Sequence, residues 1–562
     1  MWLFFEVEMS DGNVVFVLHT HLPYVLHHGE WPHGSDWLCE AVSECYIPLL
    51  NVFHDLLAEG VQPSISIDIS PILCEQLEHP DFKEIFIRYC DNKINLAHQD
   101  AVDMLIAGVE PHMIYLAHFW QDWYSKRKRD FIDVYDTSIV QALKSLQDQG
   151  AIELLTCGIT HGYLPLLGDD KSVYLQMKGA VENYKKHFGG NPRGTWIPEC
   201  AYRPSYEWRS FIPYSKYSSA SHRKGVEEIL NEVGLEHFIV DQHLFSGATK
   251  NGHHIFEHEP ENVHALQPLR VQSDQGTSGN GAIAFARHRS IALQVWSGET
   301  GYPGDSAYLD FHKKHAASSL RYWRVTDNKA DMQYKQMYNP DWIAEKTDIH
   351  AYHFIKSIES ILQQYQNHYG KQGVLCLPFD TELFGHWWFE GPEFLKNVLR
   401  GLHHSPFAML TTSSQCLDSI NIEKSVVLPE GSWGKNGNHE VWMNPETEWT
   451  WELIYKAEEQ FGNIMLAYIA KRNDVQERIL KQMLRELLLM QSSDWQFLIT
   501  TVSAKDYAEK RFVQHNADFH VLIDMLDRYK TRNTLPAKDF ELLHEIEKRN
   551  AVFSELSLDW WK

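Results

Sequence analysis

The chain has 562 residues, a formal net charge of −24 at pH 7, 19 tryptophans and 25 tyrosines. This length exceeds that of a usual single domain, so we expect one large domain with an addition. The negative charge argues against nucleic acid or an anionic membrane as a partner, but it permits a neutral ligand such as a polysaccharide. The first residues, Met1 to Glu8, lack the basic region of a secretory signal. No apolar run approaches the roughly 20 residues of a membrane span.

The eight cysteines are scattered along the chain and show no Cys-x-x-Cys spacing. Several of them lie in apolar runs, as free buried thiols do. The sequence therefore predicts reduced cysteines and a cytoplasmic protein.

Short apolar or alternating runs recur along the first three quarters of the chain and are typical of strands. They are residues 13–19, 64–70, 152–156, 195–197, 282–285 and 374–377. Helical stretches such as 139–149 lie between many of them. This alternation predicts an α/β fold built as a parallel barrel, with its chemistry at the carboxyl ends of the strands.

Two regions depart from this alternation. Residues 206–284 contain one helical patch, one short strand and a long stretch, 246–281, rich in Gly, His, Asn and Ser. We interpret them as an inserted subdomain with a mobile loop. After Leu428 the pattern becomes helical, in residues 449–471, 474–491 and 504–528, which predicts a C-terminal α-helical domain.

Two carboxylates follow the strand at 374–377 directly. Asp380 and Glu382 lie beside a glycine, a histidine and two tryptophans. Acids at a strand end next to flat aromatic rings are typical of a site that cleaves sugar acetals. The alternative is a helix start that simply favours acidic residues.

A second carboxylate, Glu199, ends the short strand at 195–197 and is flanked by Trp196 and Tyr202. A glycosidase needs one carboxylate on each side of the bond that it cleaves. Strand ends that are distant in sequence but adjacent in a barrel can supply such a pair.

Five segments together resemble glycoside hydrolase family 57, and within it the 1,4-α-glucan branching enzymes. They are His19-Thr-His-Leu-Pro-Tyr24, Thr160-His-Gly-Tyr-Leu-Pro165, Trp196-Ile-Pro-Glu-Cys-Ala-Tyr202, Phe379-Asp-Thr-Glu-Leu-Phe-Gly-His-Trp-Trp388, and Trp433-Gly-Lys-Asn-Gly with Val441-Trp-Met-Asn444. The resemblance runs nearly from end to end. It implies an incomplete (β/α)7 TIM-like barrel, with Glu199 as the nucleophile and Asp380 as the general acid/base.

The resemblance and the composition changes together give expected domain limits. The catalytic barrel would comprise residues 1–205 and 285–427, the inserted subdomain residues 206–284, and the helical domain residues 428–562.

Four histidines, His19, His21, His161 and His386, form a second group of candidates. His-x-His at a strand end is a zinc-ligand pattern in some hydrolases, so a zinc deacetylase or amidohydrolase is one interpretation. We favour neutral histidines that hydrogen-bond sugar hydroxyls, because the glucan-active segments are present. We therefore expect no metal and no cofactor.

Further candidates for sugar binding lie beside these segments. The resemblance implies that Trp433 and Trp442 line a glucan cleft and favours Trp296 as a sugar platform. Asp494 interrupts the helical periodicity and would point a carboxylate at sugar hydroxyls. The full set of expected substrate-binding residues is His19, His21, His161, Trp196, Asp241, His243, Trp296, His386, Trp433, Trp442 and Asp494.

The resemblance implies a retaining, two-step reaction on an α-glucan such as amylose, glycogen or maltodextrin. Glu199 would attack the anomeric carbon of an α-1,4 link while Asp380 protonates the leaving oxygen, and Asp380 would then deprotonate the 6-hydroxyl of an acceptor glucan. Glu382 is expected to orient the site or cap the next helix.

Two alternatives remain. In the resembled enzymes a loop tyrosine assists transfer, yet this chain has no tyrosine between Tyr217 and Tyr302. An α-amylase or 4-α-glucanotransferase of the same family is therefore a second hypothesis. A glucan-binding protein with little catalysis is a third.

Overall fold

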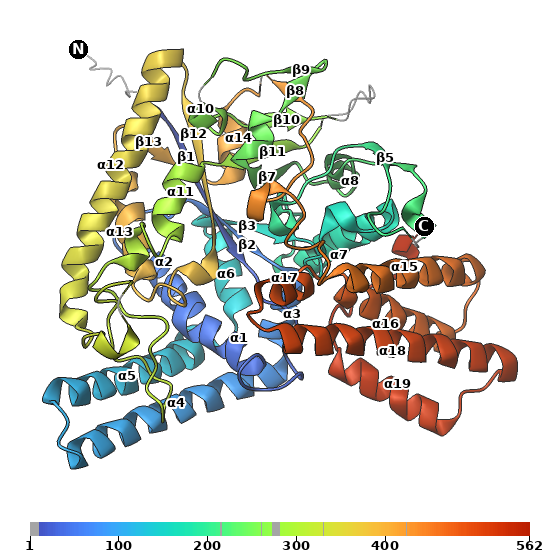
Figure 1. Ribbon diagram of the computed structural model, residues 1–562, viewed down its shortest axis with the longest axis horizontal. Helices are drawn as coiled ribbons and strands as arrows, with labels where there is room; N and C mark the ends of the chain where they lie inside the picture. Colours follow the sequence, from blue (N-terminus) through green and yellow to red (C-terminus); the bar gives the residue numbers. More distant parts are fainter. Residues whose placement is uncertain are drawn as a thin grey trace.

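The computed structural model describes residues 10–213, 216–259, 261–272, 281–329, 331–422 and 424–561. A twisted, mostly parallel sheet lies at its centre, with helices around it and a group of C-terminal helices on one side (Figure 1). The strand order is β12-β1-β2-β3-β4-β7-β11-β10-β14, and β13 pairs with β1. These strands are β12 (Gly373–Asp380), β1 (Gly12–Thr20), β2 (Ile65–Ile69), β3 (Ile152–Cys157), β4 (Gly194–Trp196), β7 (His237–Asp241), β11 (Ile283–Arg287), β10 (Leu269–Val271), β14 (Ser425–Val426) and β13 (Ala408–Leu410).

The strands from β12 to β11 along this order are all parallel to their neighbours. They therefore point their carboxyl ends toward the same edge of the sheet. The last of these strands, β11, lies close to the first, β12. The amide of His288, just after β11, donates a hydrogen bond of 3.1 Å to the carbonyl of Cys376 in β12. Among the described residues no ladder joins β11 to β12, so the barrel is not closed there.

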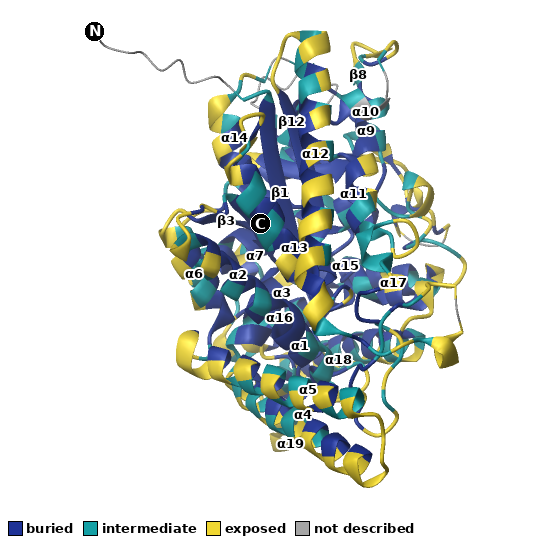
Figure 2. Ribbon diagram, turned by 90° about the vertical axis from the view of Figure 1, so that its left-hand side faces the viewer, coloured by how far each residue is buried: buried dark blue, intermediate teal, exposed yellow. Residues whose placement is uncertain are grey.

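Strand burial explains the sequence pattern. All nine residues of β1 are buried, and so are the first seven of β12. Strands covered on both faces read as continuous apolar runs, as 374–377 does. The core that these strands form is dark in Figure 2, while α12 (Ile343–Tyr369) and α13 (Gly391–His403) expose one side and bury the other.

The helices between the strands include α2 (Ile47–Ala58), α6 (Ile139–Asp148) and α7 (Asp170–Phe188). The predicted helix at 139–149 is thus confirmed. A long pair, α4 (Pro80–Ile106) and α5 (Pro111–Arg129), projects at one corner of the molecule (Figure 1). Within the described residues, no helix combines the length and apolarity that crossing a membrane requires. All eight cysteines are buried and unpaired.

The region 206–284 is only partly separate from the sheet. It holds a small hairpin of β5 (Tyr206–Trp208) and β6 (Ser221–Arg223), helix α8 (Val226–Glu232) and a two-stranded pair at 249–254. Its strands β7 and β10, however, belong to the central sheet. Residues 260 and 273–280 of the expected mobile loop lie outside the described residues. The proposed domain limits stay a prediction.

The C-terminal helices confirm the predicted helical pattern after residue 428. They are α15 (Glu448–Tyr468), α16 (Asp474–Met490), α17 (Asp494–Thr501), α18 (Lys505–Arg532) and α19 (Ala537–Arg549). They also contact the segment after β1. The hydroxyl of Tyr24 donates a hydrogen bond of 2.8 Å to the carbonyl of Arg549, and the buried Arg511 guanidinium donates to the carbonyl of Tyr24.

Candidate active site

The carboxyl ends of three adjacent strands align three polar residues. In the register of the sheet, His19 of β1 is opposite Asp68 of β2 on one side and Asp380 of β12 on the other. The parallel arrangement therefore brings residues more than 300 positions apart to the same level of the same edge. This is the edge at which α/β barrels place their chemistry.

Glu199 follows β4 in a tight turn, η4 (Pro198–Cys200), with an unusual backbone. Its φ is +61°, and the φ of Cys200 is +47°, both in the left-handed region that residues with a side chain seldom adopt. Such strain costs about 1–3 kcal/mol per residue and persists only where the surroundings hold it. Here the amide of Trp433 donates a hydrogen bond of 3.1 Å to the carbonyl of Glu199.

Both carboxylate oxygens of Glu199 are held by donors from the last quarter of the chain. The indole N–H of Trp433 donates to Oε2 at 3.0 Å, and the Ser493 hydroxyl donates to Oε1 at 2.9 Å. The side chain remains 12% exposed. Burial raises the pKa of Glu199 to about 7, although the two donors lower it in part. Glu199 is thus an oriented carboxyl that is ionised above neutral pH.

Asp380 is the last residue of β12 and is partly exposed. Burial raises its pKa well above the usual value, and the negative charges of Glu382 and Glu199 raise it further. The two candidate carboxylates are therefore close enough to influence each other, and the pKa of Asp380 is shifted in the direction that favours its protonated form.

Glu382 lies deeper than Asp380. Its side chain is buried and accepts a hydrogen bond of 2.5 Å from the Tyr46 hydroxyl. Burial raises its pKa to about 7. This location fits a residue that orients the site, and that role stays a prediction.

Three of the four candidate histidines form one cluster. His21 stacks on His161 with ring centroids 3.9 Å apart, and the Nε2 atoms of His19 and His161 are 3.1 Å apart. His21 Nε2 lies 3.0 Å from Oδ2 of Asp494, which brings this helical-domain carboxylate to the strand ends. These contacts lower the pKa of Asp494 to about 2 against the effect of burial.

His386 lies apart from this cluster. Its Nδ1 atom is 2.8 Å from Oε2 of Glu44, and the Arg321 guanidinium is 3.1 Å from the same oxygen. The structure thus places His386 in a buried ion-pair group beside the predicted site. No contact joins it to the other three histidines among the described residues, and its sugar-binding role stays a prediction.

Two sets of potential metal ligands coincide with the cluster: His19, Cys157 and His161, and His21, His161 and Asp494. Their ligand atoms lie within 4.8 Å of one another. Both nitrogens of His19 and of His161 are, however, already hydrogen-bonded within the protein. A metal at either set would have to replace these bonds.

The candidate tryptophans divide into partly exposed and buried ones. Trp433 and Trp296 are partly exposed and meet edge to face, with centroids 5.9 Å apart. Trp196 and Trp442 are fully buried: Trp196 stacks on His19 at 4.5 Å, and Trp442 stacks on Tyr163 at 4.5 Å. Only the first two present surface that a sugar ring could cover.

Asp241 and His243 lie at the end of β7. Asp241 pairs with Arg287 of β11, whose Nη2 donates to Oδ2 at 2.6 Å, and the Arg287 guanidinium lies 5.5 Å from the Trp433 ring. His243 Nε2 contacts the carbonyl of Gly437 at 3.0 Å. Asp241 and His243 thereby connect the sheet edge to the segment that holds Glu199.

Sequence reasoning missed three polar residues of this site: Asp68, Arg287 and Ser493. Asp68 lies in the predicted strand 64–70 and Arg287 just beyond the predicted strand 282–285, each a charged group at an apolar strand's end. That signal could have found them. Ser493 directly precedes Asp494, but nothing in its own sequence surroundings indicates a contact with Glu199.

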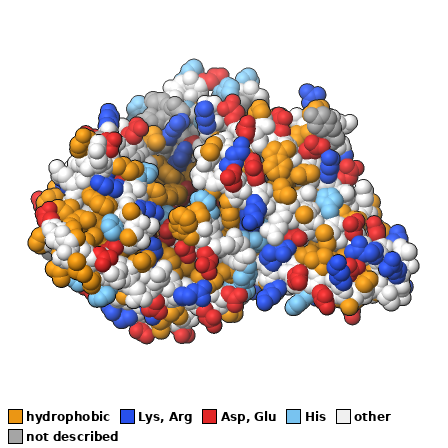
Figure 3. Space-filling view, turned by 60° about the horizontal axis from the view of Figure 1, so that its bottom comes forward, with side chains coloured by type: hydrophobic (Ala, Val, Ile, Leu, Met, Phe, Trp, Pro, Cys, Tyr) orange, Lys and Arg blue, Asp and Glu red, His pale blue; other side chains and the backbone are white. Residues whose placement is uncertain are grey.

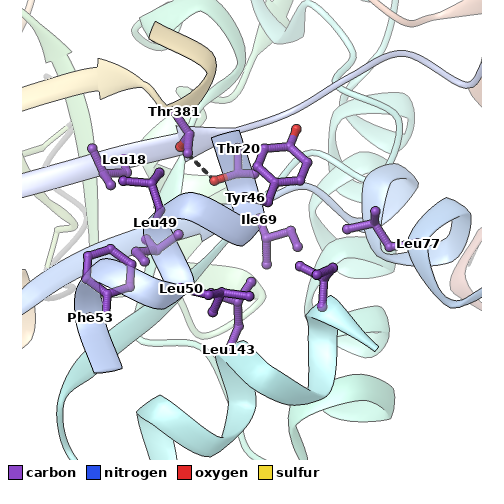
Figure 4. Close-up of a pocket in the computed structure, with 12 residues that line it drawn as sticks. Leu18, Thr20, Tyr46, Leu49, Leu50, Phe53, Ile69, Leu77, Leu143 and Thr381 are labelled. Carbon is purple, nitrogen blue, oxygen red and sulfur yellow. Dashed lines mark hydrogen bonds between the residues drawn. The ribbon is translucent and has the colours of Figure 1, made fainter. Parts of the chain in front are cut away.

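The molecule has a hollow on one face of its surface and a small cavity in its interior. Figure 3 shows a hollow in the surface with hydrophobic side chains in its floor. An interior cavity of about 20 Å³ lies between β1, β2, α2 and α6 (Figure 4). It has room for about one water molecule, so it cannot hold a sugar. At its edge Thr20 and Thr381 share a hydrogen bond of 2.7 Å, which fixes the segment before Glu382.

Comparison with known proteins places this chain. The family model described as glycosyl hydrolase family 57 matches residues 15–429, and a model described as the C-terminal part of 1,4-alpha-glucan branching enzyme matches residues 453–561. The chain belongs to glycosyl hydrolase family 57. Within this family it is 40% identical to a 1,4-alpha-glucan branching enzyme of Thermococcus kodakarensis, over 96% of this chain and 77% of that one.

Two solved structures superimpose on nearly all of the chain. A family 57 branching enzyme from Pyrococcus horikoshii superimposes with a TM-score of 0.89 at 38% identity, covering 98% of this chain and 97% of that one. The α-amylase AmyC from Thermotoga maritima superimposes with a TM-score of 0.81 at 29% identity, covering 98% and 99%. The sequence-based recognition of the family is confirmed.

Proposed function

We propose that the chain is a 1,4-α-glucan branching enzyme, which cleaves an α-1,4 link of a glucan and transfers the released segment to a 6-hydroxyl group. The observation that supports this function is which part of the chain supplies the side chains around Glu199. The segment matched as the C-terminal part of a branching enzyme supplies Ser493 and Asp494 to the same strand-end site as Glu199 and Asp380.

The reaction would be retaining. Glu199 attacks the anomeric carbon while Asp380 donates its proton to the leaving oxygen, and a covalent glycosyl-enzyme forms. The direction of the pKa shift supports this assignment, because burial and neighbouring negative charge keep Asp380 protonated before the first step. The donors Trp433 and Ser493 hold Glu199 in one orientation for attack.

In the second step Asp380, now ionised, takes the proton of the acceptor's 6-hydroxyl, and this oxygen displaces Glu199. The expected distance between the two carboxyls in such an enzyme is about 5–5.5 Å. The partly exposed rings of Trp296 and Trp433 would support sugar rings beside the scissile bond, with His21 and Asp494 toward the hydroxyls. We take amylose, glycogen or maltodextrin as the substrate.

Hydrolysis is the second candidate, since water can replace the acceptor in the same mechanism. It is favoured by one specific observation, the absence of a tyrosine between Tyr217 and Tyr302. The likeness to the α-amylase AmyC supports keeping hydrolysis as an alternative. We further propose a role in glycogen biosynthesis, because branching acts on an α-glucan, and a cytoplasmic location, because the buried cysteines are unpaired.

One incubation distinguishes these activities. Purified protein is mixed with amylose, and α-1,6 linkages are counted by proton NMR while free reducing ends are measured in the same sample. Branching predicts new α-1,6 signals well in excess of reducing ends. Reducing ends without branches would establish a hydrolase, and neither product would favour a binding protein. The variant Glu199→Gln, which lacks the proposed nucleophile, is the negative control.

A further inference from the structure

Asp68 is a buried carboxyl of which, among the described residues, only one oxygen has a hydrogen-bond partner. Its side chain has no exposed surface, and Oδ2 lies 2.5 Å from Nδ1 of His19. Among the described residues, Oδ1 has no hydrogen-bond partner. An ionised carboxylate in this position would bury an unpaired anionic oxygen, which is costly. A neutral carboxylic acid needs only one acceptor for its O–H, and His19 Nδ1 supplies it.

From Asp68 an unbroken chain of hydrogen bonds leads to Glu199. His19 Nε2 lies 3.1 Å from His161 Nε2, and His161 Nδ1 lies 2.8 Å from the Ser493 hydroxyl oxygen. The Ser493 hydroxyl in turn lies 2.9 Å from Glu199 Oε1. Both nitrogens of each imidazole are used, so every proton in the chain has a defined place.

The positions of these protons can be assigned by starting from Glu199, at the other end of the chain of hydrogen bonds. An ionised Glu199 can only accept, so Ser493 must donate its single hydroxyl proton to it. His161 must then carry a proton on Nδ1 and accept on Nε2. His19 must carry a proton on Nε2 and accept on Nδ1, and the donor to that nitrogen must be Asp68.

The surroundings agree with neutral groups along the chain. Burial lowers the pKa of His19 and of His161, and it raises the pKa of Asp68. Several charged or titratable groups act on the chain from other elements. Glu382 and Cys157 act on Asp68, and His21 acts on both imidazoles and on Glu199. Asp494 acts on His161 and Glu199, and Asp380 acts on Glu199. Trp196 covers the face of His19 and excludes water.

We propose that Asp68 is a positioning residue, which as a neutral acid fixes the order of protons from His19 to Ser493 and so keeps a hydroxyl donor on ionised Glu199. Without a hydrogen-bond donor at position 68, the direction of donation along the chain of hydrogen bonds can reverse. Ser493 would then donate to His161 instead, and Glu199 would lose one of its two donors. The proposal rests on the proposed role of Glu199 as nucleophile, but the protonation pattern itself does not.

The direct test is neutron diffraction from deuterium-exchanged crystals of the wild-type protein. We expect deuterium on Asp68 Oδ2, on Nε2 of His19 and on Nδ1 of His161, with Ser493 pointing its deuterium at Glu199. Deuterium on both nitrogens of His19 would mean an ion pair with Asp68 and would overturn the proposal. Deuterium only on Nδ1 of His19 would overturn it equally.

A matched pair of variants tests the consequence. The variant Asp68→Asn keeps an N–H donor toward His19. The variant Asp68→Leu keeps the approximate size of the side chain but removes the donor. We expect Asp68→Asn to retain the wild-type profile of kcat/KM against pH. Asp68→Leu should move its acid limb to higher pH and lower kcat/KM about 10- to 100-fold, as expected for one hydrogen bond to a charged group.

A structural role alone would not separate the two variants in this way. If Asp68→Asn shifts the acid limb as far as Asp68→Leu does, the neutral-acid role is wrong. If Asp68→Leu fails to fold, the Asp68→Asn profile and the neutron map decide by themselves. Absence of turnover on amylose in the wild type would instead reject the proposed function and leave the neutron result to stand alone.

Discussion

Ser493 donates a hydrogen bond of 2.9 Å to Glu199 across 294 residues of sequence. The donor directly precedes α17, the third of the C-terminal helices, and the acceptor belongs to a strained turn after β4. The candidate nucleophile is therefore oriented by a different part of the chain from the one that carries it. The same is true of Trp433, whose indole N–H and backbone amide both donate to Glu199.

The two proposed carboxylates should be individually essential. Replacing Glu199 by Gln, or Asp380 by Asn, should lower kcat on amylose by more than about 10⁴-fold, as loss of a group central to a covalent mechanism does. Glucan binding should persist in Glu199→Gln, because the aromatic and polar surface is unchanged. Initial rates and binding isotherms on the same preparations check this, and a Glu199→Gln enzyme with wild-type turnover would refute the assignment.

The dependence of kcat/KM on pH should have its acid limb near neutrality. Glu199 must be ionised to attack, and burial raises its pKa to about 7, so activity should fall as the pH drops below about 7. Asp380 must be protonated, and its pKa is raised well above the usual range, so activity should persist on the alkaline side until Asp380 ionises. A profile that stays flat down to pH 5 would contradict these ionisation states.

Removal of the hydrogen-bond donor of Trp433 should move the acid limb of the kcat/KM profile to higher pH. Trp433→Phe keeps an aromatic ring but loses the N–H to Oε2 of Glu199, which destabilises the carboxylate form and raises the pKa of Glu199 further. We expect kcat/KM at neutral pH to fall about 10- to 100-fold, the equivalent of about 1.5–3 kcal/mol. Trp449→Phe is the matched control, since its N–H donates to the carbonyl of Glu446. Equal effects of the two substitutions would speak against the role of Trp433.

The ion pair of Glu44 and Arg321 should be important for stability. The pair is buried, and Arg321 holds the pKa of Glu44 at about 2, against a value of 4.5 for a free side chain. Arg321→Met leaves this carboxylate with His386 alone and should lower the free energy of unfolding by about 3–5 kcal/mol at pH 7. The exposed pair of Lys144 and Asp148 is the control, and Lys144→Ala should cost at most about 0.5 kcal/mol.

The sign of the pH effect provides a second check on this pair. Because the folded pKa of Glu44 lies below the unfolded one, its contribution is fully present above pH 4.5 and is lost as the pH falls toward 2. The difference between wild type and Arg321→Met should therefore shrink over that range in chemical unfolding. A difference that grows on acidification would mean that Glu44 is not the partner.

Much of the fold could be predicted from local pattern. The apolar runs at 13–19 and 374–377 became β1 and β12, because strands covered on both faces must be apolar throughout. The parallel alternation also placed Asp380 and His19 at one edge, and the register confirms that they face each other. Periodicity also located α15, α16 and α18 to within a few residues, but it did not show α17 or α19.

The contacts that complete the site could not be predicted in this way. Ser493 approaches Glu199 only through the docking of α17 against the strand ends, a tertiary contact with no local signature. Asp68 was part of an expected strand, but its partner His19 is set by strand register. The sequence also did not show that β7 and β10 join the main sheet, because their apolar runs are too short to indicate a pairing partner.

Covalent trapping tests the central claim most directly. The variant Asp380→Ala is incubated with a maltooligosyl fluoride, whose leaving group needs no acid, and peptides are mapped by mass spectrometry. The account predicts a glycosyl adduct on Glu199 that accumulates because no base remains to activate the acceptor. An adduct on Glu382 or another residue, or turnover with inverted anomeric configuration, would contradict it.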